Sequence, residues 1–219
     1  IVDPEILKTA KRLFTDELDI HPDYTLESVV DKANGVEITF VDSAGTERTE
    51  TFEKIIMAAG RRPNTMNLGL ENLGIDPRNI ALDAMTLQVD GHPVFIAGDV
   101  NNLHPLLHEA ADDGHLAGRN AANFPELHAE VRRTPLGIVF SDPQIAIIGG
   151  GYRALEDCVA VAGTVDYGDQ GRARTAGINK GQLRVYAEVS SMKIIGAEMI
   201  GPRAEHIGHL LAWAIQSDM

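Results

Sequence analysis

The chain has 219 residues, 44% of them hydrophobic and 23% charged, which is the composition of an ordinary globular protein long enough to bury a substantial core. Its formal net charge of −13 argues against a nucleic-acid partner, because proteins that bind a phosphate backbone present clustered lysines and arginines. No uninterrupted apolar run approaches the length of a membrane span and no signal-peptide pattern is present, so we expect a cytoplasmic protein with no membrane partner.

The first predicted element is an amphipathic helix. Asp3, Pro4 and Glu5 form a typical helix start, with aspartate as the capping residue, proline at the first helical position and glutamate near the positive end of the helix dipole. Apolar residues then recur at helical spacing as far as Leu18. The chain begins directly at this helix and stops at the predicted end of another one, so we expect it to be a piece of a longer protein.

Strands follow the first helix. Alternating or continuous apolar patterns predict strands at residues 25–30, 36–40, 46–52 and 54–60. Residues 42–45 form the predicted hairpin turn, and the last strand is expected to be buried and to end in Gly60. This succession is typical of the second half of a nucleotide-binding domain. The Arg-Arg-Pro-Asn sequence at residues 61–64 then breaks the pattern and predicts a domain junction.

The middle of the chain carries the strongest indication of function. A buried strand is predicted at residues 94–97, and it ends in Gly98 and Asp99. Glycine lets a ligand approach the backbone at the end of a strand, and an aspartate carboxylate can accept a hydrogen bond from a ligand hydroxyl. The alternative is that Asp99 only caps the following helix. That helix is predicted at residues 106–122, and its many alanines permit close approach to a sheet or a ligand.

A second junction is predicted near Phe124 and Pro125. Beyond it, the apolar pattern predicts a strand at residues 145–148 and a hairpin over residues 182–200. A final helix is predicted from about Ala204.

The Gly-Gly-Gly-Tyr-Arg-Ala sequence at residues 149–154 follows a strand and matches the Gly-x-Gly-x-x-Ala fingerprint of dinucleotide-binding loops. Asp166 lies at about the right distance along the chain for a ribose contact. A true fingerprint opens a parallel βαβ unit, whereas the strands that follow here form a tight hairpin. A loop without a cofactor is therefore the favoured interpretation.

Histidines in and around the predicted helix at residues 106–122 suggest a metal site. His104, His108 and His115, with Asp112 beside them, are residue types that bind metal ions. Histidines and acids on the solvated face of a helix are more common, and Pro105 is expected to leave His104 outside the helix. We therefore expect no metal.

Several segments of the chain, in the correct order, resemble the pyridine nucleotide–disulphide oxidoreductases. The segment from Thr86 to Asp99 resembles the second flavin motif of this family, and the segment from Ala59 to Thr65 resembles the exit from its NAD domain. Three segments resemble its dimerisation domain: residues 139–146, 171–174 and 195–202. The run from Leu107 to Ala110 is most similar to the dihydrolipoamide dehydrogenase branch.

The resemblance implies a fold that combines α/β and α+β domains. Residues 1–62 would form the C-terminal half of an NAD(P)-binding domain, and residues 63–127 the C-terminal part of an FAD-binding domain, both Rossmann-like. Residues 128–219 would form an α+β dimerisation domain that is truncated at its C-terminus.

The same resemblance implies the binding residues. Gly98 and Asp99 would bind FAD, with Asp99 accepting from a hydroxyl of the ribityl chain. The backbone of Leu106, Leu107 and His108 would face the pyrimidine ring of the flavin, where the positive end of a helix favours negative charge. His108 could instead be only a surface residue.

By the same resemblance, Gly60 and Val29 would lie near bound NAD or NADP. Val29 is more simply interpreted as an ordinary core residue. No catalytic residue is expected within the chain.

The resemblance implies a flavin-dependent enzyme that transfers electrons between NAD(P)H, FAD and a disulfide or dithiol substrate. It also implies a homodimer formed through residues 134–219. The family's glycine-rich loops, redox-active cysteine pair and C-terminal His-Pro segment have no counterpart here, and the single cysteine, Cys158, excludes an internal disulfide. We therefore expect the fragment alone to be inactive. The alternatives are a soluble flavin transhydrogenase of the same fold and a non-catalytic flavin-binding or dimerisation module.

Overall fold

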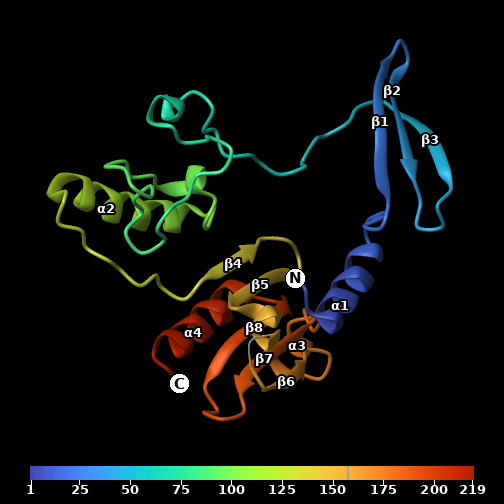
Figure 1. Cartoon of the computed structure of the whole chain (residues 1–219). Helices are drawn as coiled ribbons and strands as arrows, with labels where there is room; N and C mark the ends of the chain where they lie inside the picture. Colours follow the sequence, from blue (N-terminus) through green and yellow to red (C-terminus); the bar gives the residue numbers. More distant parts are fainter. Residues whose placement is uncertain (157) are drawn as a thin grey trace. The chain divides into compact units, whose positions relative to one another are not determined.

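The structure is a computed structural model that describes residues 1–156 and 158–219 (Figure 1). The chain forms two compact units: one contains residues 12–61, and the other contains residues 1–11 together with residues 62–219. Within the described residues, no helix is both long enough and apolar enough to cross a membrane. The division into three domains at residues 62 and 127 stays a prediction.

The unit of residues 12–61 contains an antiparallel sheet. Its three described strands follow one another in chain order: β1 (Thr25–Lys32), β2 (Gly35–Val41) and β3 (Glu47–Phe52). The strands predicted at residues 25–30, 36–40 and 46–52 are thereby confirmed.

The turn between β2 and β3 is organised by Asp42, as the sequence predicts for residues 42–45. Its Oδ1 accepts hydrogen bonds of 2.9 Å from the backbone N–H groups of Ala44 and Thr46. Its Oδ2 accepts a hydrogen bond of 3.0 Å from Nε of Arg48. These bonds, above all the one from Thr46, lower the pKa of the Asp42 carboxyl. The ionised aspartate therefore stabilises the hairpin turn.

The buried strand predicted at residues 54–60 is wrong. This segment has no strand, and two of its large apolar side chains are exposed, Ile56 to 91% and Met57 to 63%. A strand requires a neighbouring strand to satisfy its backbone N–H and C=O groups. None of the described residues pairs with this segment, so its apolar sequence does not form a strand here.

The first helix, α1 (Pro4–Thr15), begins where the sequence predicts. Oδ1 of Asp3 accepts hydrogen bonds from the N–H groups of Glu5 at 2.8 Å and Ile6 at 3.2 Å, so Asp3 is the helix cap. The side chains of Ile6 and Ala10 are buried, one turn apart on the same face of the helix. The amphipathic pattern therefore describes a helix face that packs into the protein.

The middle of the chain is mostly irregular, apart from short 3₁₀ helices and one long helix: η1 (Leu70–Leu73), η2 (Gly98–Asn101) and α2 (Leu107–Asn123). The helix predicted at residues 106–122 is confirmed to within one residue. The strand predicted at residues 94–97 is wrong, because only Phe95 forms an isolated bridge, with Gln88. The segment is nevertheless inward-facing: Ile96 is buried with Leu70, Ile75 and Val89.

The C-terminal part of the chain forms an antiparallel sheet. The described strands have the order β4-β5-β8-β7-β6: β4 (Leu136–Val139), β5 (Gln144–Gly149), β8 (Ile194–Gly201), β7 (Gln182–Glu188) and β6 (Ala160–Asp166). The helical elements of this region are η3 (Gly151–Glu156), α3 (Gly171–Thr175) and α4 (Ala204–Gln216). β5 confirms the strand predicted at residues 145–148, and β7 with β8 confirms the hairpin predicted over residues 182–200. α4 confirms the final helix predicted from about Ala204.

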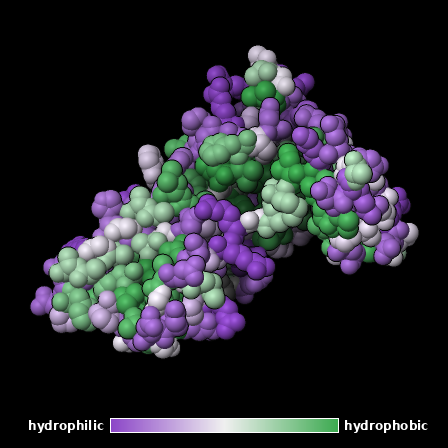
Figure 2. Space-filling model, turned by 90° about the horizontal axis from the view of Figure 1, so that it is seen from above, coloured by the Kyte–Doolittle hydropathy of each residue, from purple (hydrophilic) through white to green (hydrophobic). Residues whose placement is uncertain are grey.

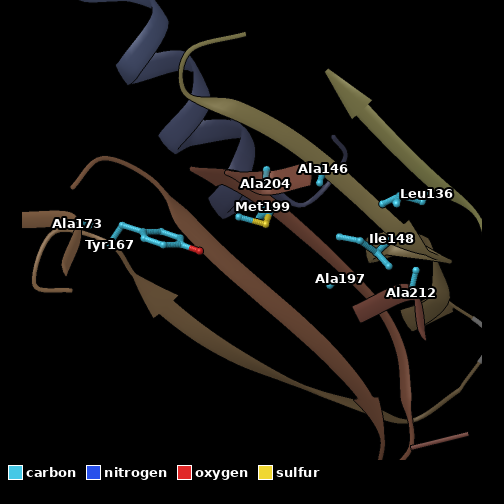
Figure 3. Close-up of a cluster of buried hydrophobic side chains, with 9 residues drawn as sticks. All are labelled: Leu136, Ala146, Ile148, Tyr167, Ala173, Ala197, Met199, Ala204 and Ala212. Carbon is cyan, nitrogen blue, oxygen red and sulfur yellow. The ribbon is translucent and has the colours of Figure 1, made fainter. Parts of the chain in front are cut away.

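The core of this region lies between the sheet and α4, which packs on β4, β5 and β8. Figure 3 shows its buried side chains, with Tyr167 and Ala173 at one end of the group and Leu136 at the other. Ile148 of β5 and Met199 of β8 are fully buried. Their burial explains why β5 and β8 read as apolar runs in the sequence.

The glycine-rich sequence at residues 149–154 forms the end of β5 and the start of η3. Gly149 pairs with Gly196 of β8 in an antiparallel ladder. A dinucleotide fingerprint requires a parallel βαβ unit at this point, and the described strands of this sheet pair only in antiparallel fashion. The structure therefore supports the interpretation of these glycines as part of a structural loop.

Candidate functional site

The amino end of α2 is the first part of the candidate site. Leu106 occupies the capping position with extended backbone angles (φ −128°, ψ 144°), and no described side chain caps the helix. The first N–H groups of a helix lack partners within the helix, and the helix dipole adds partial positive charge there. The backbone at Leu107 and His108 can therefore donate hydrogen bonds to an electron-rich ligand.

A groove opens beside this helix end. Its cavity volume is about 1010 Å³, and Leu106, Leu107 and His108 line it. Apolar side chains from the C-terminal part of the same unit also line it, among them Phe140 and Trp213. Exposed hydrophobic side chains are visible among hydrophilic ones in Figure 2, and Leu107 is 89% exposed and Trp213 69% exposed. Such a groove suits a flat, largely apolar ligand.

The turn at Gly98 and Asp99 is the second part of the site. Gly98 has a φ of +77°, and a Cβ added to it would lie 3.2 Å from Cβ of Ala110 in α2. A glycine is therefore needed both for the backbone conformation and for packing against the helix. Asp99 is partly exposed in η2 and does not cap α2, because Leu106 takes that position. The alternative role of Asp99 as the cap of the following helix is wrong.

A buried ionic cluster supports this turn, and the sequence interpretation missed it. Asp113 and Glu109, one turn apart on α2, are buried to 2% and 5% exposure. Arg132 forms an ion pair with both carboxylates, and the one with Glu109 measures 2.7 Å. The sequence did carry one indication of this cluster. Glu109 and Asp113 recur at helical spacing with the other buried residues of α2, so they lie on its buried face. The sequence interpretation instead assigned acidic side chains of this helix to the solvated face.

The residues predicted to lie near NAD(P) belong to the unit of residues 12–61. Val29 lies in the middle of β1, opposite Ile38 of β2, and it is 41% exposed. Its interpretation as an ordinary buried core residue is therefore wrong. Gly60 has a φ of +86° in the irregular segment after β3. The proximity of Val29 and Gly60 to NAD(P) stays a prediction.

The histidines of α2 do not assemble into a metal site. Among the described residues, no group of three or more histidine, cysteine, aspartate or glutamate side chains is arranged to hold a metal ion. The ring of His115 instead forms a hydrogen bond of 2.8 Å with the carbonyl oxygen of Ala111. Its role is therefore local to the helix.

Comparison with known proteins identifies relatives along most of the chain. Residues 136–219 match the family described as the pyridine nucleotide-disulphide oxidoreductase dimerisation domain. The chain is 31% identical over 208 residues to a dihydrolipoyl dehydrogenase of Halobacterium salinarum, and 28% identical over 207 residues to that of Bacillus subtilis. These alignments cover 91% and 92% of this chain but only 42% and 43% of the relatives. The chain thus spans less than half the length of these relatives.

Solved structures share the fold. LpdA from Mycobacterium tuberculosis superimposes with a TM-score of 0.82 at 24% identity, covering 100% of this chain and 48% of that chain. The HOCl-induced flavoprotein disulfide reductase RclA from Escherichia coli gives a TM-score of 0.78 at 18% identity, covering 98% of this chain and 49% of that one. At these identities the likeness concerns the fold alone, and it confirms the predicted fold class.

Proposed function

Because residues 136–219 match the dimerisation domain of the pyridine nucleotide–disulphide oxidoreductase family and dihydrolipoyl dehydrogenases align along most of the chain, we propose that it is the C-terminal part of an FAD-dependent oxidoreductase of the dihydrolipoyl dehydrogenase type. The whole enzyme would transfer electrons between NAD(P)H, FAD and a dithiol or disulfide substrate. In such enzymes the cofactors carry the hydride and thiol chemistry, and the protein supplies binding, orientation and electrostatics. The contribution of this chain is therefore the FAD-facing surface and the dimer surface.

The uncapped amino end of α2, open to the groove, is the observation that carries the proposal. The backbone of Leu106, Leu107 and His108 would face the pyrimidine edge of the flavin ring. The N–H groups of Leu107 and His108 would be the donors, because that of Leu106 donates to the carbonyl oxygen of His104 at 2.8 Å. The partial positive charge at this helix end would stabilise negative charge on a ligand there. The leucine, phenylalanine and tryptophan side chains of the groove fit a flat aromatic ring system. The donors and the apolar wall are thus compatible with a flavin.

The turn at Gly98 and Asp99 would bind the chain that leads from the flavin ring to the nucleotide. Asp99 would accept a hydrogen bond from a ribityl hydroxyl, a type of bond to a charged group that contributes about 1.5–3 kcal/mol. Gly98 would keep this turn close to α2. NAD or NADP would lie near Val29 and Gly60 in the other unit.

The proposal includes a homodimer formed by residues 134–219, with the same surface of each copy in contact. The glycine-rich loops and the redox cysteine pair of the family have no counterpart in these 219 residues. We therefore propose that the fragment does not turn over by itself. Its role in a longer protein would be to complete the flavin site and to hold the dimer together.

The test uses the whole protein encoded by the reading frame that contains this chain. The purified protein is assayed for bound FAD and for oxidation of dihydrolipoamide by NAD⁺ or NADP⁺, and we expect both. Hydride transfer between nicotinamides without dithiol oxidation would instead support the transhydrogenase. A protein without flavin or nicotinamide turnover would be the non-catalytic module and would overturn the proposal.

The assignment of Asp99 has its own experiment. We expect Asp99→Ala to lose FAD during gel filtration, because the ribityl chain loses its acceptor. The matched control is Asp90→Ala, which removes an exposed carboxylate from a nearby turn. Equal flavin content in both variants would contradict the role of Asp99.

A further inference from the structure

Asp113 connects α2 to the turn that contains Asp99. Its Oδ2 accepts a hydrogen bond of 3.0 Å from the backbone N–H of Gly98 and one of 2.5 Å from Nδ2 of Asn101. Gly98 and Asn101 are the first and last residues of η2. A single carboxylate oxygen therefore holds both ends of the turn against the helix.

The other oxygen of Asp113 is held by Arg132. The side chain of Arg132 is 18% exposed, and its guanidinium also donates to Oε2 of Glu109 at 2.7 Å. A buried carboxylate is costly unless it is paired and hydrogen-bonded. Here the guanidinium on one side and the turn donors on the other meet that requirement, so the position of the carboxylate is tightly defined.

This arrangement sets the distance between the two proposed flavin contacts. Asp99 lies between Gly98 and Asn101, and α2 begins at Leu107, about 1.7 turns before Asp113 on the same helix. Ala110 packs against Gly98 from the same helix. A shift of the turn relative to α2 would therefore move Asp99 relative to the N–H groups at Leu107 and His108.

We propose that Asp113, held by Arg132, is a positioning residue of the flavin site, which keeps the Asp99 turn in register with the amino end of α2. This inference rests on the proposed function, because it assumes that FAD binds there. Asp113 touches no part of the ligand and acts only through the turn. Loss of its carboxylate should therefore weaken FAD binding and change the environment of the flavin.

The experiment compares Asp113→Ala with Asn120→Ala in the whole flavoprotein. Asn120 is fully buried on the same face of α2 and bonds to the carbonyl oxygens of Thr86 and His128, but it does not contact the turn. Both variants lose buried polar contacts of the same helix, so both should unfold at lower temperature. Only Asp113→Ala should raise the dissociation constant for FAD, by about ten- to a hundredfold, and shift the visible absorption spectrum of the remaining bound flavin.

Asp113→Asn is the conservative variant. It keeps an acceptor for the N–H of Gly98 but loses the charge that pairs with Arg132, so its FAD affinity should fall between those of wild type and Asp113→Ala. If Asp113→Ala does not fold, Asp113→Asn decides: weaker FAD binding than in Asn120→Ala supports the positioning role, and equal binding overturns it.

The outcomes separate this inference from the proposed function. A wild-type protein that binds no FAD would overturn both. A wild-type protein that binds FAD, together with Asp113 variants whose FAD affinity and flavin spectrum match those of Asn120→Ala, would overturn the positioning role alone.

Discussion

The carboxylate of Asp3 accepts a hydrogen bond of 2.6 Å from the hydroxyl of Tyr186, a residue 183 positions further along the chain. Nη1 of Arg184 donates to both oxygens of the same carboxylate, at 2.8 and 2.7 Å. The N–H groups of Val2 and Asp3 in turn donate to Oε2 of Glu198, each at 3.1 Å. The start of α1 is therefore anchored to strands β7 and β8 by buried polar contacts.

The charge state of this anchor follows from its surroundings. Burial by itself would raise the pKa of Asp3, but hydrogen bonds from Tyr186, Arg184 and the helix N–H groups outweigh it, so the pKa is lowered. Burial, together with the hydrogen bond to Asp3, raises the pKa of Tyr186. At neutral pH the pair is an aspartate anion that accepts from a protonated tyrosine.

Removing the Asp3 carboxylate should destabilise the unit of residues 1–11 and 62–219. Asp3→Ala leaves the Arg184 charge without its partner and removes the helix cap, and breaking a buried pair in this way costs about 3–5 kcal/mol. Urea unfolding at neutral pH measures the change. The control is Glu5→Ala, an exposed carboxylate on the first turn of the same helix, which should change stability by less than about 0.5 kcal/mol. Similar losses in the two variants would contradict the anchoring role.

The contribution of Asp3 should depend on pH. A carboxyl whose pKa is lower in the folded than in the unfolded chain stabilises the fold above its ordinary value of 3.8 and loses this effect as pH falls through the lowered value. The stability difference between wild type and Asp3→Asn should therefore be full at neutral pH and shrink in acid below about pH 4. Unfolding midpoints measured from neutral to strongly acidic pH test this, and a difference that stays constant would refute it.

The local elements of the fold could be predicted because their signals are local. The cap at Asp3, the turn at Asp42 and the helical periodicity of α2 and α4 each lie within a short stretch of sequence. The partners of Asp3 and Asp113 could not be predicted in this way. Arg184 lies 181 residues from Asp3, and Arg132 lies 19 residues from Asp113, and no local pattern links such positions.

The strands predicted at residues 54–60 and 94–97 were wrong for a related reason. An apolar run shows that a segment can form a strand, but the neighbouring strand decides whether it does. At the candidate site, motif resemblance pointed to Gly98 and the amino end of α2, and their role in binding flavin stays a prediction. The sequence interpretation did not identify the buried carboxylates at Glu109 and Asp113, because a charged residue in a helix is usually exposed.

Gly181, just before β7, should not tolerate a side chain. Its φ is +121°, and a Cβ there would lie 2.0 Å from the carbonyl oxygen of Ile200 in the neighbouring strand. Gly181→Ala should therefore cost at least about 1–3 kcal/mol from backbone strain alone, with the clash adding to it. Gly171→Ala is the control, since nothing lies within 4 Å of a Cβ at Gly171. The melting temperature of Gly181→Ala should lie clearly below that of Gly171→Ala. Equal melting temperatures would contradict the prediction that Gly181 cannot accept a side chain.

Leu210 on α4 should contribute to the proposed homodimer. Its apolar side chain is 62% exposed, and burying a leucine contributes about 1.5–3 kcal/mol. Leu210→Glu places a charge on that surface, so the dimer dissociation constant should rise by at least about tenfold. Sedimentation velocity over a range of protein concentrations measures this. The control is Ile56→Glu, which alters an apolar side chain that is 91% exposed and lies outside residues 134–219. If the two variants dimerise equally well, the two-fold interface does not include this face of α4.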